Sequence, residues 1–376
     1  MEMKRVDRWL VMSLFLVVCT MVALQMFGQD PMTSVLFSCT FPLTGLLWLR
    51  TVRRTFTVND GLVLLTVGLS AICVLVDLLR SGDTAGFAYG KKWIMFSMSL
   101  LFFQAASRLR PDRKLRNFVH RAAVCLAGLS FLMFVLRKAE MYTMDSVSSR
   151  FLTFGFTNPN LATLFLAMVS MLLWCSGTWY RRCGAGIMAV FVVLTGARNA
   201  MLALVLFFIC WMFWGRKQKT SRYPGLWAWS PLLFAAAYLL VMRLPQIQQW
   251  LQDWTEEGKS LDSRLELWQL ARETIARSPL IGAYHGISDG TGISQLHNSH
   301  VDIAASYGVP VLILVCILLR RWLCSGENGT IWGFVGALLL GFGEAAVFSG
   351  GLGIYIFAGM FLLLAKEDGN ENRICQ

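Results

Sequence analysis

The chain has 376 residues, of which 56% are hydrophobic and only 15% are charged. Soluble globular domains of this length carry more charge and fewer apolar residues, so the composition excludes that class. Apolar runs recur along the whole chain, which indicates a polytopic membrane protein.

The apolar runs predict about twelve membrane spans, and the shorter runs are expected to be tilted, partial or re-entrant. The predicted fold class is all-α. Residues 1–242 are expected to contain spans one to nine with an outer loop at 137–159. Residues 243–300 are expected to form a large outer helical loop, and residues 301–376 the last three spans and a short tail. The predicted spans cover residues 9–27, 32–49, 61–79, 92–106, 118–136, 160–174, 184–194, 200–214, 225–242, 301–319, 330–347 and 350–365.

The net charge of +12 is explained by the position of the basic residues along the chain. When the N-terminus is placed in the cytoplasm, most of the 34 lysines and arginines fall in short inner loops. This is the positive-inside bias of membrane proteins. It predicts cytoplasmic termini and an outward-facing 243–300 loop, and it argues against a nucleic-acid partner.

Two short outer segments carry polar residues next to predicted spans. Residues 137–159 end in a run from Arg150 to Asn160, and Asn158 precedes a proline, so a helix is expected to begin after Asn158. Arg198 follows the apolar run 184–194, which spans only about 17 Å. Unless Trp179 and Tyr180 extend that helix inward, Arg198 is expected below the outer surface, where an arginine normally faces a cavity or a partner.

The 243–300 loop is expected to contain two helices. The first is a short amphipathic helix with apolar residues spaced for one face, lying on the bilayer or against the protein's own spans. The second begins near Ser263, which forms a capping-box pattern with Glu266, and it ends at Ser278-Pro279. The apolar residues are Ile247, Trp250, Leu251 and Trp254 in the first helix and Leu261, Leu265, Trp268 and Ile275 in the second.

Charged and imidazole groups in this loop indicate chemistry on an anion. Arg264, Trp268 and Arg272 are spaced by four residues and lie along one side of the second helix. Arg264 falls in its first turn, where the helix dipole favours a negative charge. A glycine-rich stretch then leads to His297 and Asn298, directly before the next span.

Three separated patterns resemble the O-antigen ligase/polymerase superfamily. They are Phe-Thr-Asn-Pro-Asn160 before a span, Thr195-Gly-Ala-Arg198 between two short spans, and Ser263-Arg264…Trp268 followed by Pro279-Leu-Ile-Gly282 and His297-Asn298. The resemblance extends from about residue 150 to residue 319. It implies a metal-independent, inverting glycosyltransferase of the GT-C-like class that needs no cofactor. Such a protein moves a glycan from an undecaprenyl-diphosphate donor to an acceptor hydroxyl outside the cytoplasmic membrane.

The resemblance also implies roles for individual residues. Arg198, Arg264 and His297 match catalytic positions: the guanidinium forks suit phosphate oxygens, and an imidazole with a pKa near about 6.5 can accept the acceptor's proton. The chain has His300 where an aromatic residue often stands and Ala197 where serine is frequent. The candidate substrate-binding residues are Arg150, Asn160, Trp268, Arg272, Asn298 and His300.

Several alternatives remain open at this point. Arg264 can pair with Glu266, Trp268 can belong to the core, and His297 can simply precede a helix. A transporter or flippase of a lipid-linked glycan would also have about twelve spans, although no internal repeat is visible. The implied partners are the lipid bilayer, the lipid-linked donor, a glycan or lipid-glycan acceptor, and a flippase and chain-length regulator of the same pathway.

Overall fold

The computed structural model describes residues 1–28, 30–81, 87–136, 141–143, 150–156, 159–215, 223–241, 262–283, 296, 298–343, 347–348 and 353–367. Helices account for most of these residues, as the all-α prediction requires. The elements are α1 (Arg5–Met26), α2 (Asp30–Arg54), α3 (Val58–Ser81), α4 (Phe87–Arg108), α5 (Arg113–Val135), β1 (Met141–Thr143), β2 (Arg150–Leu152), α6 (Pro159–Cys175), α7 (Trp179–Leu194), α8 (Arg198–Cys210), the π-helix η1 (Trp211–Gly215), the 3-10 helix η2 (Tyr223–Trp229), α9 (Ser230–Val241), α11 (Asp262–Arg277), α12 (Ser299–Tyr307), α13 (Val309–Leu323), α14 (Ile331–Leu340) and α15 (Ile354–Leu364).

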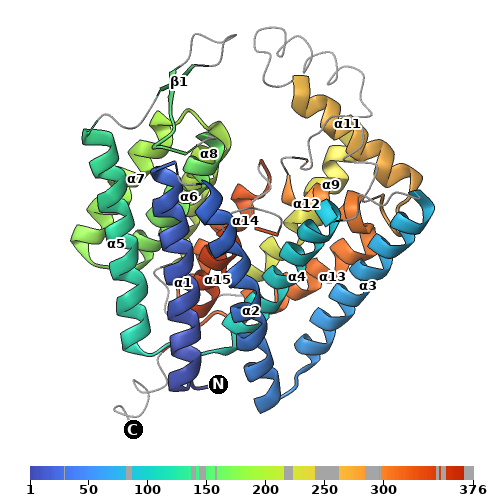
Figure 1. Ribbon diagram of the computed structural model, residues 1–376, viewed down its shortest axis with the longest axis horizontal. Helices are drawn as coiled ribbons and strands as arrows, with labels where there is room; N and C mark the ends of the chain where they lie inside the picture. The colour runs from blue at the N-terminus through green and yellow to red at the C-terminus, as the bar shows by residue number, and fades with distance from the viewer. Residues whose placement is uncertain are drawn as a thin grey trace.

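Most helices run in roughly the same direction, and both chain termini lie at one end of the bundle (Figure 1). The β1 strand and α11 lie at the opposite end, at the top of that view. We call these the terminal end and the distal end. The described parts of the predicted 243–300 and 137–159 loops, which are α11 and the β1–β2 strands, therefore lie at the distal end.

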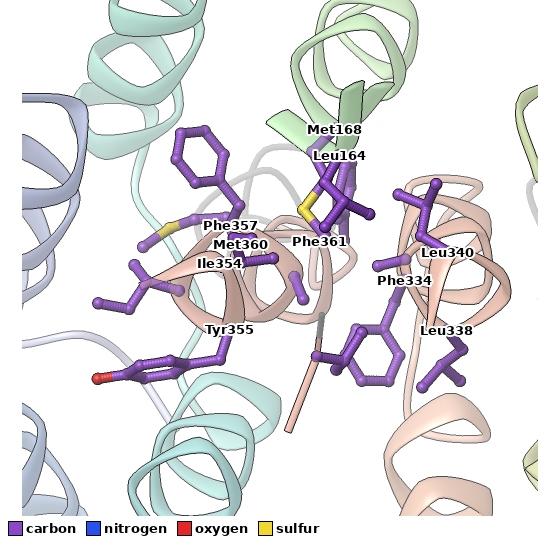
Figure 2. Close-up of a cluster of buried hydrophobic side chains, with 14 of the residues drawn as sticks. Leu164, Met168, Phe334, Leu338, Leu340, Ile354, Tyr355, Phe357, Met360 and Phe361 are labelled. Carbon is purple, nitrogen blue, oxygen red and sulfur yellow. The ribbon is translucent and has the colours of Figure 1, made fainter. Parts of the chain in front are cut away.

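The centre of the bundle is formed by α14 and α15, in which every residue is buried. Both helices are apolar around their whole circumference, as expected of helices enclosed by protein. Figure 2 shows Leu164 and Met168 of α6 next to Phe361 of α15, with Phe334 and Leu338 of α14 to one side of them. Because neighbouring helices surround α14 and α15, their apolar runs can be shorter than a lipid-facing span.

Within the described residues, five helices are long and apolar enough to cross a membrane: α1, α2, α3, α5, and α8 continued by η1. Large apolar side chains are exposed at the periphery, including Leu65, Leu75 and Leu79 of α3 and Val190 and Val193 of α7. Such a surface suits lipid rather than water. The chain is therefore a multi-pass membrane protein, whereas the total of about twelve spans stays a prediction.

The predicted span 301–319 is wrong as one continuous helix, because it is divided into α12 and α13. Gly308 separates them with a φ of 86°, in the left-handed region that favours glycine. A Cβ atom at this position would also lie 2.4 Å from the Leu280 carbonyl oxygen. Residue 308 thus needs glycine both for its backbone conformation and for the close approach of a neighbouring segment.

The 137–159 segment contains a short antiparallel hairpin that the sequence did not predict. Strand β1 pairs with β2, with Met141 opposite Leu152 and Thr143 opposite Arg150. Helix α6 begins at Pro159, which confirms the start expected after Asn158. Proline is favoured in the first helical turn because its missing N–H would have no partner there.

Basic residues at the terminal end are held by buried carboxylates. Asp7 accepts hydrogen bonds from Arg50, at 3.0 Å, and from Arg54. Asp60 accepts one from Arg108 at 2.7 Å, and both aspartates have no exposed side-chain surface. Part of the basic excess attributed above to topology therefore also joins α1 to α2 and α3 to α4.

Candidate functional site

The structure describes the predicted site residues to different extents. The side chains of Arg150, Arg264 and Trp268 are not described, although their backbones belong to β2 and α11. His297 lies outside the described residues, between Leu296 and Asn298, which are both buried. The predicted surface helix around residue 250 and the loop 284–295 also lie outside them. Five other candidate residues have described positions, given below.

Arg198 is the first residue of α8, and it is exposed. The preceding helix, α7, begins at Trp179 and has 16 residues, so the inward extension considered above does occur. Within the described part of the chain, the Arg198 guanidinium forms no ion pair, in contrast to Arg54 and Arg108 at the terminal end. Arg198 therefore offers an accessible positive charge at the start of a helix, where an anion is also favoured by the helix dipole.

Two of the sequence patterns meet at the C-terminal end of α14. From the start of α8, Asn199 Nδ2 donates a hydrogen bond to the Leu340 carbonyl oxygen at 3.2 Å. From the start of α12, Asn298 Nδ2 donates to the Phe342 carbonyl oxygen at 2.8 Å. The backbone N–H of Ser299 donates to the Gly341 carbonyl oxygen at 2.9 Å. The chain segments that carry Arg198 and His297 are thus bound to carbonyls two residues apart.

Asn298 also fixes the first turn of α12. Its Oδ1 atom accepts hydrogen bonds from the backbone N–H groups of His300 and Val301, each at 3.0 Å. This is an N-cap, which satisfies helix-end donors that would otherwise lack partners. Both ends of the buried Asn298 amide are therefore engaged within the protein, which favours a positioning role over direct sugar contact.

His300 is fully buried next to the same end of α14. Its Nε2 atom lies 3.1 Å from the Leu338 carbonyl oxygen, and its ring packs against Phe342 with centroids 4.6 Å apart. Because a carbonyl only accepts, this contact requires a hydrogen on Nε2. Within the described residues Nδ1 has no hydrogen-bond partner. The predicted contact of His300 with substrate stays a prediction, and the burial of its ring favours an indirect contribution.

Helix α11 turns a defined face toward the protein. Leu267, Ala271 and Ile275 are buried, so Ile275 belongs to the inner face as predicted, while Leu267 was not expected there. At about 100° per residue, position 264 falls between positions 271 and 275 around the helix axis, about 20° from each. The helix begins at Asp262, so the expected capping-box residue Ser263 lies inside the first turn instead of before it.

The Pro279–Gly282 segment joins α11 to the junction of α12 and α13. The Val309 N–H donates to the Pro279 carbonyl oxygen at 2.8 Å, and the Ala283 N–H donates to the Ala305 carbonyl oxygen at 2.9 Å. Gly282 has a φ of 76°, and a Cβ atom there would lie 2.7 Å from that Ala305 oxygen. This crossing gives a physical reason for the Pro-Leu-Ile-Gly pattern.

A buried ion pair next to this region was missed by the sequence reading. Lys92 Nζ of α4 lies 2.6 Å from Asp302 Oδ1 and 3.0 Å from Ser306 Oγ, both in α12. The Lys92 side chain is 13% exposed and the Asp302 side chain is 3% exposed. A lysine inside a helix of a membrane protein normally pairs with an acidic group, so the position of Lys92 was the available signal. The pair links α12 to the N-terminal part of the chain.

Asn160 and Arg272 are half-buried and interact within the protein. Asn160 is the second residue of α6, and Arg272 directly follows Ala271, the middle residue of α11's buried face. Their predicted contacts with substrate are not tested by these positions. Among the described residues, no group of three His, Cys, Asp or Glu side chains is arranged to hold a metal ion.

The fold and the described site define a multi-pass helical membrane protein in which the starts of α8 and α12 meet at the end of α14. A model of the O-antigen ligase family matches residues 183–316. The match covers less than half of the chain and supports the resemblance of this part to the O-antigen ligase/polymerase superfamily. It includes Arg198, Arg264 and His297, whereas Arg150 and Asn160 precede it. The comparison with curated proteins gives no match.

Proposed function

We propose that the protein is a membrane glycosyltransferase that moves a glycan from an undecaprenyl-diphosphate donor to an acceptor hydroxyl, as an O-antigen ligase or a polysaccharide polymerase. The observation that carries this proposal is the attachment of the Arg198 and His297 segments to one end of α14, inside the part of the chain that matches the family. The exposed Arg198 charge supports an anionic donor.

In the proposed reaction the acceptor oxygen attacks the anomeric carbon of the donor glycan. The bond from that carbon to the diphosphate oxygen breaks, and its electron pair leaves with the lipid diphosphate. A single displacement from the opposite side inverts the anomeric configuration. The acceptor proton passes to His297, while Arg198 and Arg264 balance the charge that develops on the leaving group.

We assign supporting roles to the remaining candidates. Arg272 and Arg150 would add positive charge near the donor, Trp268 would pack against a sugar or the core, and Asn160 would contact substrate. Asn298 and His300 would fix the position of His297. In this proposal residues 243–300 form the catalytic loop of a GT-C-like fold, and the reaction takes place on the outer face of the cytoplasmic membrane.

The reaction is expected to be independent of divalent metal, because two arginines occupy the role that a metal often has at a diphosphate. Purified protein given a lipid-diphosphate glycan and an acceptor should form product in EDTA at the same rate as in Mg²⁺. Product can be measured by gel mobility of the glycan. Loss of turnover in EDTA that Mg²⁺ or Mn²⁺ restores would contradict the arginine mechanism.

The same assay separates the enzyme from a transporter or flippase of the donor. A transporter would move the lipid-linked glycan across proteoliposomes without changing it, whereas the proposed enzyme releases the lipid diphosphate. A ligase transfers the glycan once to a different acceptor, whereas a polymerase yields a ladder of products when donor is the only glycan. These product patterns decide between the two forms of the proposal.

The outer location of the catalytic loop predicts a labelling result in intact cells. In a variant without the ten native cysteines, Gly258→Cys is expected to react with a membrane-impermeant thiol reagent once any outer membrane is permeabilised. A matched variant that keeps only the native Cys375 should react only after lysis. The opposite labelling pattern would overturn the proposed side of the reaction.

A further inference from the structure

The C-terminal end of α14 is covered by side chains from two other helices. The last carbonyl groups of a helix have no partner within it and need donors from elsewhere. Here Asn199 of α8 supplies one donor, at Leu340, and Asn298 of α12 supplies another, at Phe342. His300 reaches the Leu338 carbonyl oxygen, two residues before the last residue of the helix.

Gly343 makes room for the Asn199 contact. A Cβ atom at residue 343 would lie 2.2 Å from both Cγ and Nδ2 of Asn199, far closer than non-bonded atoms allow. Asn199 and the chain that follows α14 therefore pack directly on each other. The glycine at 343 and the amide at 199 form one fitted contact, and a change at either residue disturbs the other.

The consequence concerns Arg198, the chain neighbour of Asn199. Arg198 is exposed, and its side chain has no ion pair among the described residues that would hold it in place. Its backbone, however, is fixed through Asn199 to the same three-residue stretch, 340–342, that binds Asn298. The distance between the Arg198 backbone and Asn298, which follows His297 in the sequence, is therefore set through the end of α14.

We propose that Asn199 is a positioning residue of the active site, which holds the Arg198 backbone at a fixed distance from Asn298, the chain neighbour of His297, by its hydrogen bond to the Leu340 carbonyl. This inference rests on the proposed function, because it assumes that Arg198 binds the donor diphosphate. Asn199 itself is not expected to touch substrate. The simpler explanation is that Asn199 only satisfies the Leu340 carbonyl. Its loss would then lower the amount of folded protein without changing the kinetics of the protein that does fold.

Asn328 provides a matched control for the simpler explanation. Its Nδ2 atom donates to the Leu364 carbonyl oxygen, at the end of α15, with a distance of 3.0 Å. The contact has the same chemistry as that of Asn199, but Asn328 lies beside Glu327, which pairs with Arg110 at the terminal end. Asn328→Ala should therefore report the cost of losing such a contact without any effect on donor binding.

The experiment measures donor KM, kcat and thermal stability in detergent for Asn199→Ala, Gly343→Ala, the double variant, Asn328→Ala and Arg198→Ala. Asn199→Ala and Gly343→Ala should each lower kcat/KM for the donor by about 10–10²-fold, because a misplaced binding group costs that much. Acceptor KM should stay unchanged. Combining the two should add little, since removal of the Asn199 amide frees the space that a Cβ at 343 requires.

Each other outcome overturns one claim. If Arg198→Ala leaves donor kinetics unchanged, the proposed role of Arg198 fails. If Arg198→Ala is impaired while Asn199→Ala keeps normal kinetics, or loses only stability as Asn328→Ala does, the positioning role fails. Additive losses in the double variant would show that the two residues act separately. If Asn199→Ala does not accumulate in membranes, Gly343→Ala, which keeps the asparagine, gives the same test.

Discussion

Replacing His297 with alanine is expected to lower turnover by roughly 10²–10⁴-fold, the usual contribution of a general base. The acceptor hydroxyl would then attack without a group to take its proton. Donor binding should change little, because the charge of the lipid diphosphate is balanced by Arg198 and Arg264. Single-turnover rates and donor affinity, measured on the same purified protein, separate these two effects.

The matched comparison is Arg264→Lys, which keeps the positive charge but loses the planar fork that binds two phosphate oxygens. This variant should weaken donor binding and turnover together, unlike His297→Ala. If His297→Ala retains near wild-type product in cells, His297 is not the base. The proton would then pass to His300, or departure of the diphosphate would lead bond formation and no base would be needed.

Replacing Lys92 with methionine is expected to destabilise the protein by about 3–5 kcal/mol, because it leaves the Asp302 carboxylate buried without its partner. Asp302 is almost completely enclosed, and Lys92 Nζ lies only 2.6 Å from its Oδ1 atom. Adding Asp302→Asn should recover part of the loss, since the amide carries no buried charge. The free energy of unfolding of both variants can be measured in mixed micelles.

An exposed ion pair provides the control for this experiment. Arg277 and Glu273 of α11 lie 3.2 Å apart with side chains 81% and 58% exposed. Arg277→Ala should therefore cost at most about 0.5 kcal/mol. Equal stabilities for Lys92→Met and Arg277→Ala would mean that water reaches Asp302 and that the buried pair does not join α4 to α12.

The sequence identified the elements that depend on local patterns. Apolar runs and flanking prolines gave the positions of most helices, including the starts of α6 at Pro159 and the end of α11 before Pro279. These features follow from neighbouring residues alone, since a proline restricts its own backbone and the residue before it. The family resemblance, carried by Arg198, Arg264 and His297, was confirmed for residues 183–316.

Contacts between distant segments were decided by the tertiary structure. An asparagine's sequence position does not indicate which carbonyl it will meet, so the meeting of Asn199 and Asn298 at α14 was not predictable. Lys92 and Asp302 are 210 positions apart in the sequence, so no local hydrophobic pattern indicates that they form a pair. The break at Gly308 had a local signal, with Pro310 soon after it, whereas the Leu280 carbonyl packed against Gly308 had none. The spacing of apolar residues indicates which face of a helix is buried. Only the packing of the whole chain determines which other element that face contacts.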